Sequence, residues 1–244
     1  MSISKTIGLV MMISFLQMIP LRAGAEGPKG DFSKEPVRLM TEIYRDYHDW
    51  KTDDGIAKTE EALSAVSRIY DKDREALIHD KNLRLNKAYQ VKSTLHTLLG
   101  MLYYRKSLAV VSEQKGEGIA SITGKMRRNE EITDRELEDL DRALKADSCL
   151  EDMRQYLTRA QAEFQKAIDT DSANPSPHFQ LAGIYSAMKT NEMTDKAEQE
   201  LVSAAQLSGA EGDRKAVDRA METLRELNPN SVYLKKGQGG DDGN

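Results

Sequence analysis

Cysteine is almost absent from this chain of 244 residues, since Cys149 is the only one. A single cysteine excludes an intrachain disulfide, so the fold must be held together by packing of its interior. Two interpretations of Cys149 are open: a reactive or intermolecular thiol, or a small side chain near the start of a helix. We favour the second, because no histidine neighbours Cys149 in the sequence.

Basic residues are not in excess. Lysine and arginine number 35 against 40 aspartates and glutamates, a formal net charge of −5. Binding to nucleic acid depends on clustered positive charge, so this balance argues against a nucleic-acid partner. Residues 125–142 concentrate charge of both signs, either as a surface for a partner or as the solvated face of a helix. We favour the solvated face, because mixed charge of this kind is common on exposed helices.

The sequence also lacks a metal-binding or catalytic motif. Its four histidines form no His-Glu-x-x-His pair and no cluster with cysteine, so we expect no metal site and no cofactor. The segment most like a phosphate-binding loop, Gly118 to Lys125, has five residues between its glycines where the motif needs about four, and Met126 replaces the required hydroxyl. No nucleophile with an adjacent base stands out. We therefore expect no catalytic residues and no enzyme activity.

The longest apolar run is a short one near the N-terminus. After Lys5, residues 7–20 are predominantly apolar, about 14 residues where a spanning helix needs roughly 20. Together with the small residues that follow, this order predicts a secretory signal peptide over 1–25, cleaved after about Ala25. The alternative, an uncleaved membrane anchor, is disfavoured by the short run. We expect a periplasmic or secreted protein with no stable membrane span after cleavage, opening with a linker over 26–34.

Few residues interrupt helices in the next part of the chain. Apolar side chains recur there at helical spacing, which predicts N-terminal helices within 35–92. The first is expected from about Pro36 to Trp50, followed by a turn at 53–55, and the second from about Ile56 to Tyr70. Residues 72–112 contain no proline and one glycine, which predicts a long helix with a break near 80–82.

One pattern of small and aromatic residues occurs twice in the C-terminal half. The first copy reads Leu99-Gly100-x-x-Tyr103 and then Ala160-x-x-x-Phe164-x-x-Ala167; the second reads Leu181-Ala182-x-x-Tyr185 and then Ala197-x-x-x-Leu201-x-x-Ala204. Alanines at three- and four-residue steps lie on one helix face, where two helices can approach closely. The pattern resembles the tetratricopeptide repeat, a helix-turn-helix unit, in an exported bacterial protein.

The resemblance implies an all-α fold, an antiparallel helix-turn-helix stack. Since 60 residues separate Gly100 from Ala160 where the family has about 12, the first repeat would hold a long helical insertion. The implied segments are a first repeat over 93–174 with its insertion at about 113–150, a second repeat over 175–208, a capping helix over 211–230 and a disordered tail over 231–244.

Capping patterns refine these boundaries. Thr133 and Ser148 are each followed three residues later by a glutamate, the spacing of a capping box. They predict a short helix and then a long one over about 149–170. A capping serine and a proline at 176–177 predict the start of the next helix, and 189–194 the turn that follows it.

In the repeat family, the first helix of each pair lines a concave groove that accepts a peptide or a partner helix. The resemblance implies a partner-binding groove at Thr97, Met101, Tyr104, Arg105, Phe179 and Ser186. It implies contacts between packed helices at Gly100, Tyr103, Ala160, Phe164, Ala167, Ala182, Tyr185, Ala197, Leu201 and Ala204. His96 and His178 share the fourth position of their repeats, where a ring packed between helices is expected.

These expectations favour a non-enzymatic periplasmic scaffold or adaptor that binds a protein or peptide partner in a concave helical groove. The alternative is a small-molecule-binding or transport-accessory protein with an apolar pocket lined by Tyr103 and Tyr104. A third hypothesis, a helical hydrolase, would need His48, His79 and His96 in one cleft. An open groove would favour a polypeptide partner, whereas a deep cavity would favour a small molecule.

Overall fold

The computed structural model describes residues 34–79, 83–114, 147–188 and 190–236, together with isolated positions between 121 and 138. The predicted signal peptide at 1–25, the linker up to residue 33 and most of the predicted insertion lie outside the described residues. So do residues 237–244.

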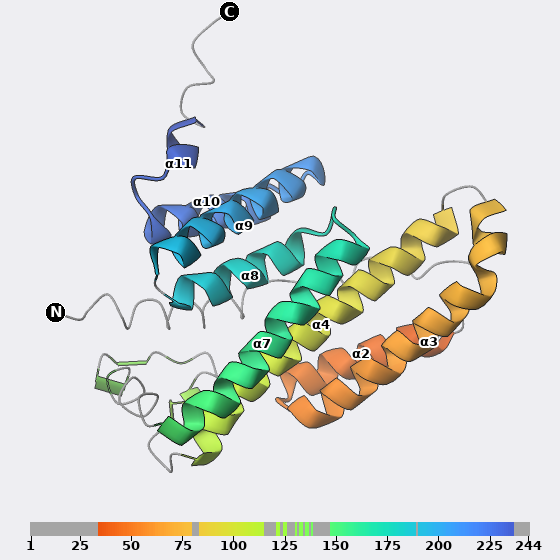
Figure 1. The fold of residues 1–244 in the computed structure, drawn as a ribbon, viewed down its shortest axis with the longest axis horizontal. Helices are drawn as coiled ribbons and strands as arrows, with labels where there is room; N and C mark the ends of the chain where they lie inside the picture. Colours follow the sequence, from red (N-terminus) through yellow and green to blue (C-terminus); the bar gives the residue numbers. More distant parts are fainter. Residues whose placement is uncertain are drawn as a thin grey trace, which may run out of the picture. The chain divides into compact units, whose positions relative to one another are not determined.

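Within the described residues every regular element is a helix, which confirms the predicted all-α fold (Figure 1). These residues divide into two compact units, an N-terminal unit over 34–171 and a C-terminal unit over 172–236. The helices of the N-terminal unit are α2 (Lys34–His48), α3 (Thr52–His79), α4 (Leu83–Gln114) and α7 (Asp147–Thr170); those of the C-terminal unit are α8 (Pro175–Met188), α9 (Asn191–Ala210), α10 (Arg214–Leu227) and α11 (Val232–Lys236).

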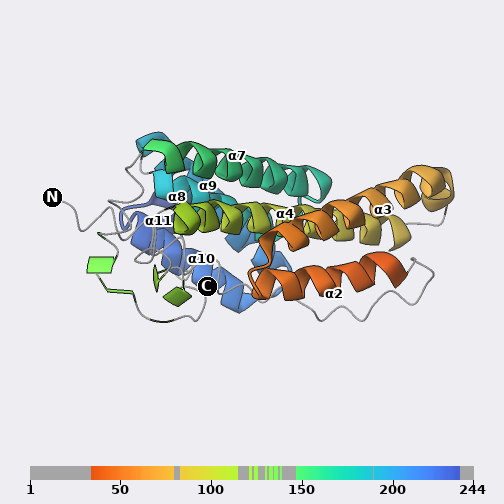
Figure 2. The same ribbon diagram turned by 90° about the horizontal axis from the view of Figure 1, so that it is seen from below.

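The N-terminal unit is a stack of antiparallel neighbours. Helix α2 packs on α3, α3 on α4, and α4 on α7, as Figure 2 shows from the side. The chain passes from α3 to α4 near residues 80–82, where the sequence predicts a break. Helix α4 therefore has α3 on one side and α7 on another, and it carries more of the described buried side chains of this unit than any of the other three helices.

The closest approach between α4 and α7 occurs at Gly100. A Cβ atom on Gly100 would lie 2.5 Å from the ring of Phe164, which is almost completely buried. About two helical turns before Gly100 on α4, the hydroxyl of Ser93 donates a hydrogen bond to the carbonyl oxygen of Ala167 at 2.8 Å. The two helices thus pack against each other across the long segment that separates them in the sequence.

The first turn of the chain lies earlier than predicted. The sequence predicts it at 53–55, but residues 49–51 make the turn, where Trp50 has a φ of 58°. Asp53 and Asp54 instead occupy the first turn of α3, where the helix dipole favours carboxylates. Gly55 is buried there because Leu102 of α4 approaches its Cα closely. Helix α3 also continues to His79, beyond the predicted end at residue 70.

In the C-terminal unit α8 packs on α9 and α9 on α10, and the short α11 follows α10. Helix α8 begins at Pro175, the predicted start of the second repeat, but the cap predicted at Ser176 is wrong. The side chain of Asn174 accepts a hydrogen bond from the amide of Ser176 and makes Pro175 the first helical residue. The turn predicted at 189–194 is shorter, because Thr190 caps α9 through the amide of Met193.

The predicted capping helix corresponds to α10, which begins after Asp213 caps the amide of Ala216 at 3.1 Å. The prediction of a disordered tail over 231–244 is wrong for residues 231–236. Ser231 is buried and donates to Glu198 Oε2 at 2.7 Å, and the chain forms α11 immediately afterwards. Asn228 and Ser231, which follow α10, are thus the hydrogen-bond partners of the buried Glu198 carboxylate.

Part of the insertion is described. Thr133 and Glu136 form the predicted capping box: the amide of Thr133 donates to Glu136 Oε2 at 2.9 Å, and the amide of Glu136 donates to the Thr133 hydroxyl at 3.4 Å. Hydrogen bonds from Lys125 and then Thr133 lower the pKa of Glu136 to about 2. Helix α7 begins at Asp147, two residues before the predicted start, so Cys149 lies in its first turn.

The residues predicted to pack between helices lie in the interior. Tyr103 and Tyr185 are half-buried, and the other eight are buried: Gly100, Ala160, Phe164, Ala167, Ala182, Ala197, Leu201 and Ala204. Among the described helices, none combines the length and the apolar character that crossing a bilayer requires.

We expect Gly100→Ala to destabilise the protein by about 1–3 kcal/mol, because the new methyl group overlaps the Phe164 ring, whose burial leaves it little room to move. Urea denaturation followed by circular dichroism measures this change. Gly183→Ala is the matched control, since no atom lies within 4 Å of its added Cβ. It should raise stability by about 0.5–1 kcal/mol through helix propensity. A harmless Gly100→Ala would contradict the close approach.

Candidate functional site

The predicted partner groove is closed in the N-terminal unit. Thr97, Met101, Tyr104 and Arg105 are all buried, with between 1% and 7% of each residue exposed. The side of α4 that was expected to face a partner therefore belongs to the interior. This corrects the prediction for all four residues.

One of these four residues, Arg105, is covered by α2 and the turn after it. The guanidinium of Arg105 lies 3.4 Å from the ring centre of Tyr47 and 4.6 Å from that of Trp50, and its Nη1 donates to the carbonyl oxygen of Tyr47. Stacking of this kind on aromatic rings stabilises a buried cation. Arg105 thus ties α4 to the end of α2 and is not a basic group offered to a partner.

Tyr104 is also an interior residue. Burial raises its pKa, as it does that of Tyr47, and neither hydroxyl has a hydrogen-bond partner among the described residues. Since Tyr104 is only 3% exposed, it cannot line an accessible pocket for a small molecule.

The groove predicted in the C-terminal unit is largely closed as well. Phe179 is 5% exposed and belongs to the core. Ser186 is half-buried and donates to the carbonyl oxygen of Gly183 at 2.9 Å. Of the six predicted groove residues, Ser186 alone therefore retains partial access to solvent.

We expect Arg105→Lys to lower the free energy of unfolding by about 2 kcal/mol, because an ammonium group can neither stack on both rings nor reproduce the planar geometry of the guanidinium. Thermal denaturation measures the change. Arg45→Lys on the exposed side of α2 is the matched control and should have little effect. Equal stabilities for both variants would argue that Arg105 does not hold α2 in place.

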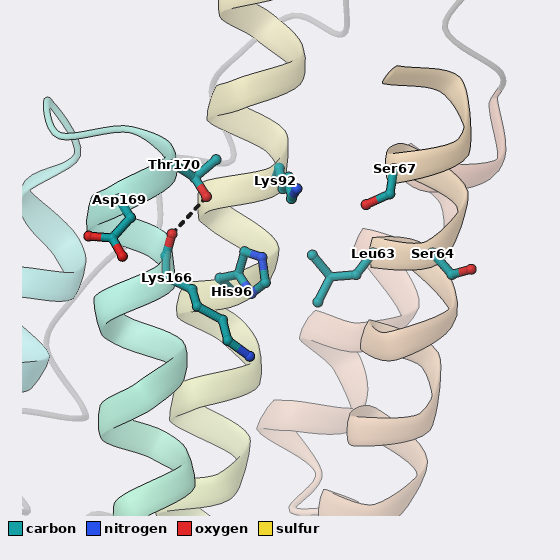
Figure 3. A pocket seen from close by; sticks show the side chains of 8 residues that line it. All are labelled: Leu63, Ser64, Ser67, Lys92, His96, Lys166, Asp169 and Thr170. Atoms are coloured by element: carbon teal, nitrogen blue, oxygen red, sulfur yellow. Dashed lines mark hydrogen bonds between the residues drawn. The ribbon is translucent and has the colours of Figure 1, made fainter. Parts of the chain in front are cut away.

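An accessible cleft lies on a different side of α4, between α3 and α7 (Figure 3). It has a volume of about 460 Å³ and is open to solvent. Helix α4 contributes Lys92 and His96 to it. Because each residue advances by about 100° around a helix, these two lie nearly opposite the predicted groove positions Thr97 and Met101. The full lining is Leu63, Ser64, Ser67, Lys92, His96, Lys166, Asp169 and Thr170.

A partly buried ion-pair network joins α4 to α7 at this cleft. His96 Nδ1 lies 2.7 Å from Glu163 Oε2, and Lys166 Nζ lies 2.7 Å from Glu163 Oε1. Burial raises the pKa of Glu163, but the hydrogen bonds from His96 and Lys166 outweigh burial and hold the pKa below its usual range. Since the carboxylate can only accept, the proton of His96 is assigned to Nδ1, which leaves Nε2 for another partner.

An aromatic cluster connects the same three helices about two helical turns along α4. The hydroxyl of Tyr103 donates to Glu60 Oε1 of α3 at 3.1 Å, and its ring stacks on Tyr156 of α7 with centroids 6.4 Å apart. The guanidinium of Arg159 lies 5.8 Å and 5.7 Å from the two ring centres. Burial is the first cause of the raised pKa of Tyr103, and the hydrogen bond to Glu60 adds to it.

The C-terminal unit repeats the histidine pair. His178 Nδ1 lies 2.6 Å from Glu200 Oε2, joining α8 to α9. In both units the histidine comes four residues before the small residue of the pattern, and the glutamate comes one residue before the large apolar residue of the second helix. The repeat pattern predicts packed rings at His96 and His178 but not their carboxylate partners. The equal offsets of Glu163 and Glu200 were the available signal, obscured by the insertion between His96 and Glu163.

His48 and His96, which the hydrolase hypothesis would bring into one cleft, lie apart. His48 is exposed at the end of α2, beside the Tyr47 that Arg105 contacts, and His96 lies nine residues from Arg105, about 14 Å along α4. The side chain of His79 lies outside the described residues. Over the part of the chain that is described, no three histidine, cysteine or acidic side chains are grouped to hold a metal ion.

No protein-family profile, no curated protein and no solved structure matches this chain. Its function is therefore inferred from the geometry of the molecule alone.

We expect Glu163→Gln to cost about 1–2 kcal/mol of stability at pH 7, because His96 and Lys166 lose a charged acceptor. The folded pKa of Glu163 is lowered, so its contribution is complete above the usual carboxyl range and is lost as the pH falls through the lowered value. Urea denaturation between pH 7 and about pH 3 should show the difference from wild type shrinking. Glu192→Gln, in an exposed pair with Lys196, should change little.

Proposed function

We propose that this protein is a non-enzymatic, exported adaptor that binds a polypeptide partner in the cleft formed by α3, α4 and α7. The observation that carries the proposal is the open form of this cleft. Its floor is one helix, its walls are two others, and its lining combines hydroxyl, charged and apolar groups. Such a surface suits a side chain or a short segment of a partner whose remaining chain stays outside.

The helical arrangement supports a repeat-type architecture of the tetratricopeptide kind. Helices α4 and α7, and likewise α8 and α9, form packed pairs with a small residue of the first helix and alanines of the second buried. Stacked helix pairs of this type present extended surfaces to partners. The proposed contact surface differs from the groove implied by the resemblance, because residues of that groove are buried in this chain.

A small-molecule function has some support, since the volume of the cleft is within the range of ligand sites. Two observations favour a polypeptide instead. The cleft is open to solvent, whereas a small ligand is usually largely enclosed. In addition, Tyr104, expected to line an apolar pocket, is buried in the core.

Site-specific photocrosslinking in the native host tests the adaptor proposal. A benzophenone amino acid replaces Thr170, which lines the cleft, or Thr158, an exposed residue of α7 outside its lining. We expect a discrete crosslinked polypeptide from position 170 and a much weaker one from 158, because only the first lies in the cleft. Circular dichroism checks that both variants fold.

Absence of an adduct at position 170, or equal adducts at both positions, would contradict a partner site in the cleft. A crosslinked small molecule, detected by the mass of the purified protein, would support the small-molecule alternative and oppose the adaptor.

A further inference from the structure

Lys92 is the one cation of the cleft whose charge is not matched by a described group. Lys166 pairs with Glu163, and Glu163 is saturated by Lys166 and His96. Asp169 accepts a hydrogen bond from Gln165 and points away from α3 in Figure 3. Within the described residues, Lys92 has no carboxylate within ion-pair distance and no hydrogen-bond partner, although its side chain is only half-exposed.

The groups that face Lys92 define a small polar pocket. Figure 3 shows the hydroxyl of Ser67 directed from α3 toward α4 and Lys92. Leu63 lies beside Ser67, directed toward His96, and supplies an apolar surface. A carboxylate can accept hydrogen bonds at the same time from an ammonium on α4, the floor of the cleft, and from a hydroxyl on the α3 wall.

We propose that Lys92 and Ser67 bind the carboxylate of an aspartate or glutamate side chain carried by the polypeptide partner, with the methylene groups of that side chain packed on Leu63. This inference rests on the proposed adaptor function and names the chemistry of the partner. A charge-assisted hydrogen bond from Lys92 would supply most of the discrimination, because the surrounding acids are already satisfied.

The charge of the cleft favours a group with one negative charge. Of the residues that line the cleft, Lys92 and Lys166 carry positive charges and Asp169 carries a negative one, so a single carboxylate neutralises the lining. A phosphate dianion would leave an excess of negative charge beside Glu163, and its repulsion would oppose binding. The partner is therefore expected to present an acidic residue and not a phosphorylated one.

Nuclear magnetic resonance titration of the full chain tests this assignment with three probes: acetyl-glutamate amide, its neutral counterpart acetyl-glutamine amide, and acetyl-phosphoserine amide. We expect saturable amide shifts at Ser67, Lys92 and His96 with the glutamate probe and much smaller shifts with the other two. Lys92→Met should weaken binding of the glutamate probe by about tenfold or more, and Lys92→Arg should restore it in part.

Lys106→Met is the matched control, because Lys106 lies on the same helix, pairs with Asp53 at 2.7 Å and is outside the cleft. It should bind the glutamate probe like wild type. Equal shifts with the neutral probe, stronger binding of the phosphoserine probe, or unchanged binding by Lys92→Met would each overturn the assignment.

The crosslinking experiment separates this inference from the adaptor proposal. If the adduct at position 170 forms in wild type and persists undiminished with Lys92→Met, the adaptor proposal stands and the acidic-residue assignment fails. If wild type forms no adduct, the adaptor proposal itself fails.

Discussion

The contact between Gly100 and the ring of Phe164 is the constraint on which the N-terminal unit depends. Because glycine has no Cβ, the ring can lie directly against the backbone of α4. This close approach of α7 to α4 brings Ala167 within hydrogen-bonding distance of Ser93, and Glu163 within hydrogen-bonding distance of His96. It also sets Tyr156 against Tyr103 on the same side of α4. The missing side chain of Gly100 therefore sets the position of α7, which is one wall of the cleft. The ion pairs of α7 depend on that position.

The second wall depends on a different interaction. Arg105 stacks on Tyr47 and Trp50 and reaches the carbonyl oxygen of Tyr47, which ties α4 to the turn between α2 and α3. Gly55 in the first turn of α3 lets Leu102 approach closely. With α2 and α3 held in this way, positions expected to bind a partner become core, and the accessible surface of α4 is the side between α3 and α7. The packing of α2 and α3 on α4 thus buries the predicted groove and leaves the cleft between α3 and α7 accessible.

The helix pair α4–α7 and the helix pair α8–α9 are joined by the same kind of His–Glu contact. His96 and His178, and Glu163 and Glu200, stand at equal offsets from the residues that pack their helices together. A carboxylate that accepts from a half-buried imidazole satisfies both groups and fixes the ring between the two helices. Only the first pair opens onto the cleft with an additional, unmatched lysine. Under the proposed function, Lys92 marks the His96–Glu163 pair as part of a binding site, whereas the His178–Glu200 pair is structural.

The sequence predicts the helical class, most helix positions, the Thr133 capping box and the residues where helices meet. These features depend on local propensity and on the spacing of small and apolar residues. The sequence misplaces the turn at 53–55 and the cap of α8, because Asp53, Asp54 and Asn174 are compatible with either a turn or a helix start, and packing decides between them. It could not predict which side of α4 is open. Periodicity shows that Arg105 and His96 lie on different sides of one helix, but only tertiary packing decided that α2 and α3 would bury the first while leaving the second accessible beside Lys92.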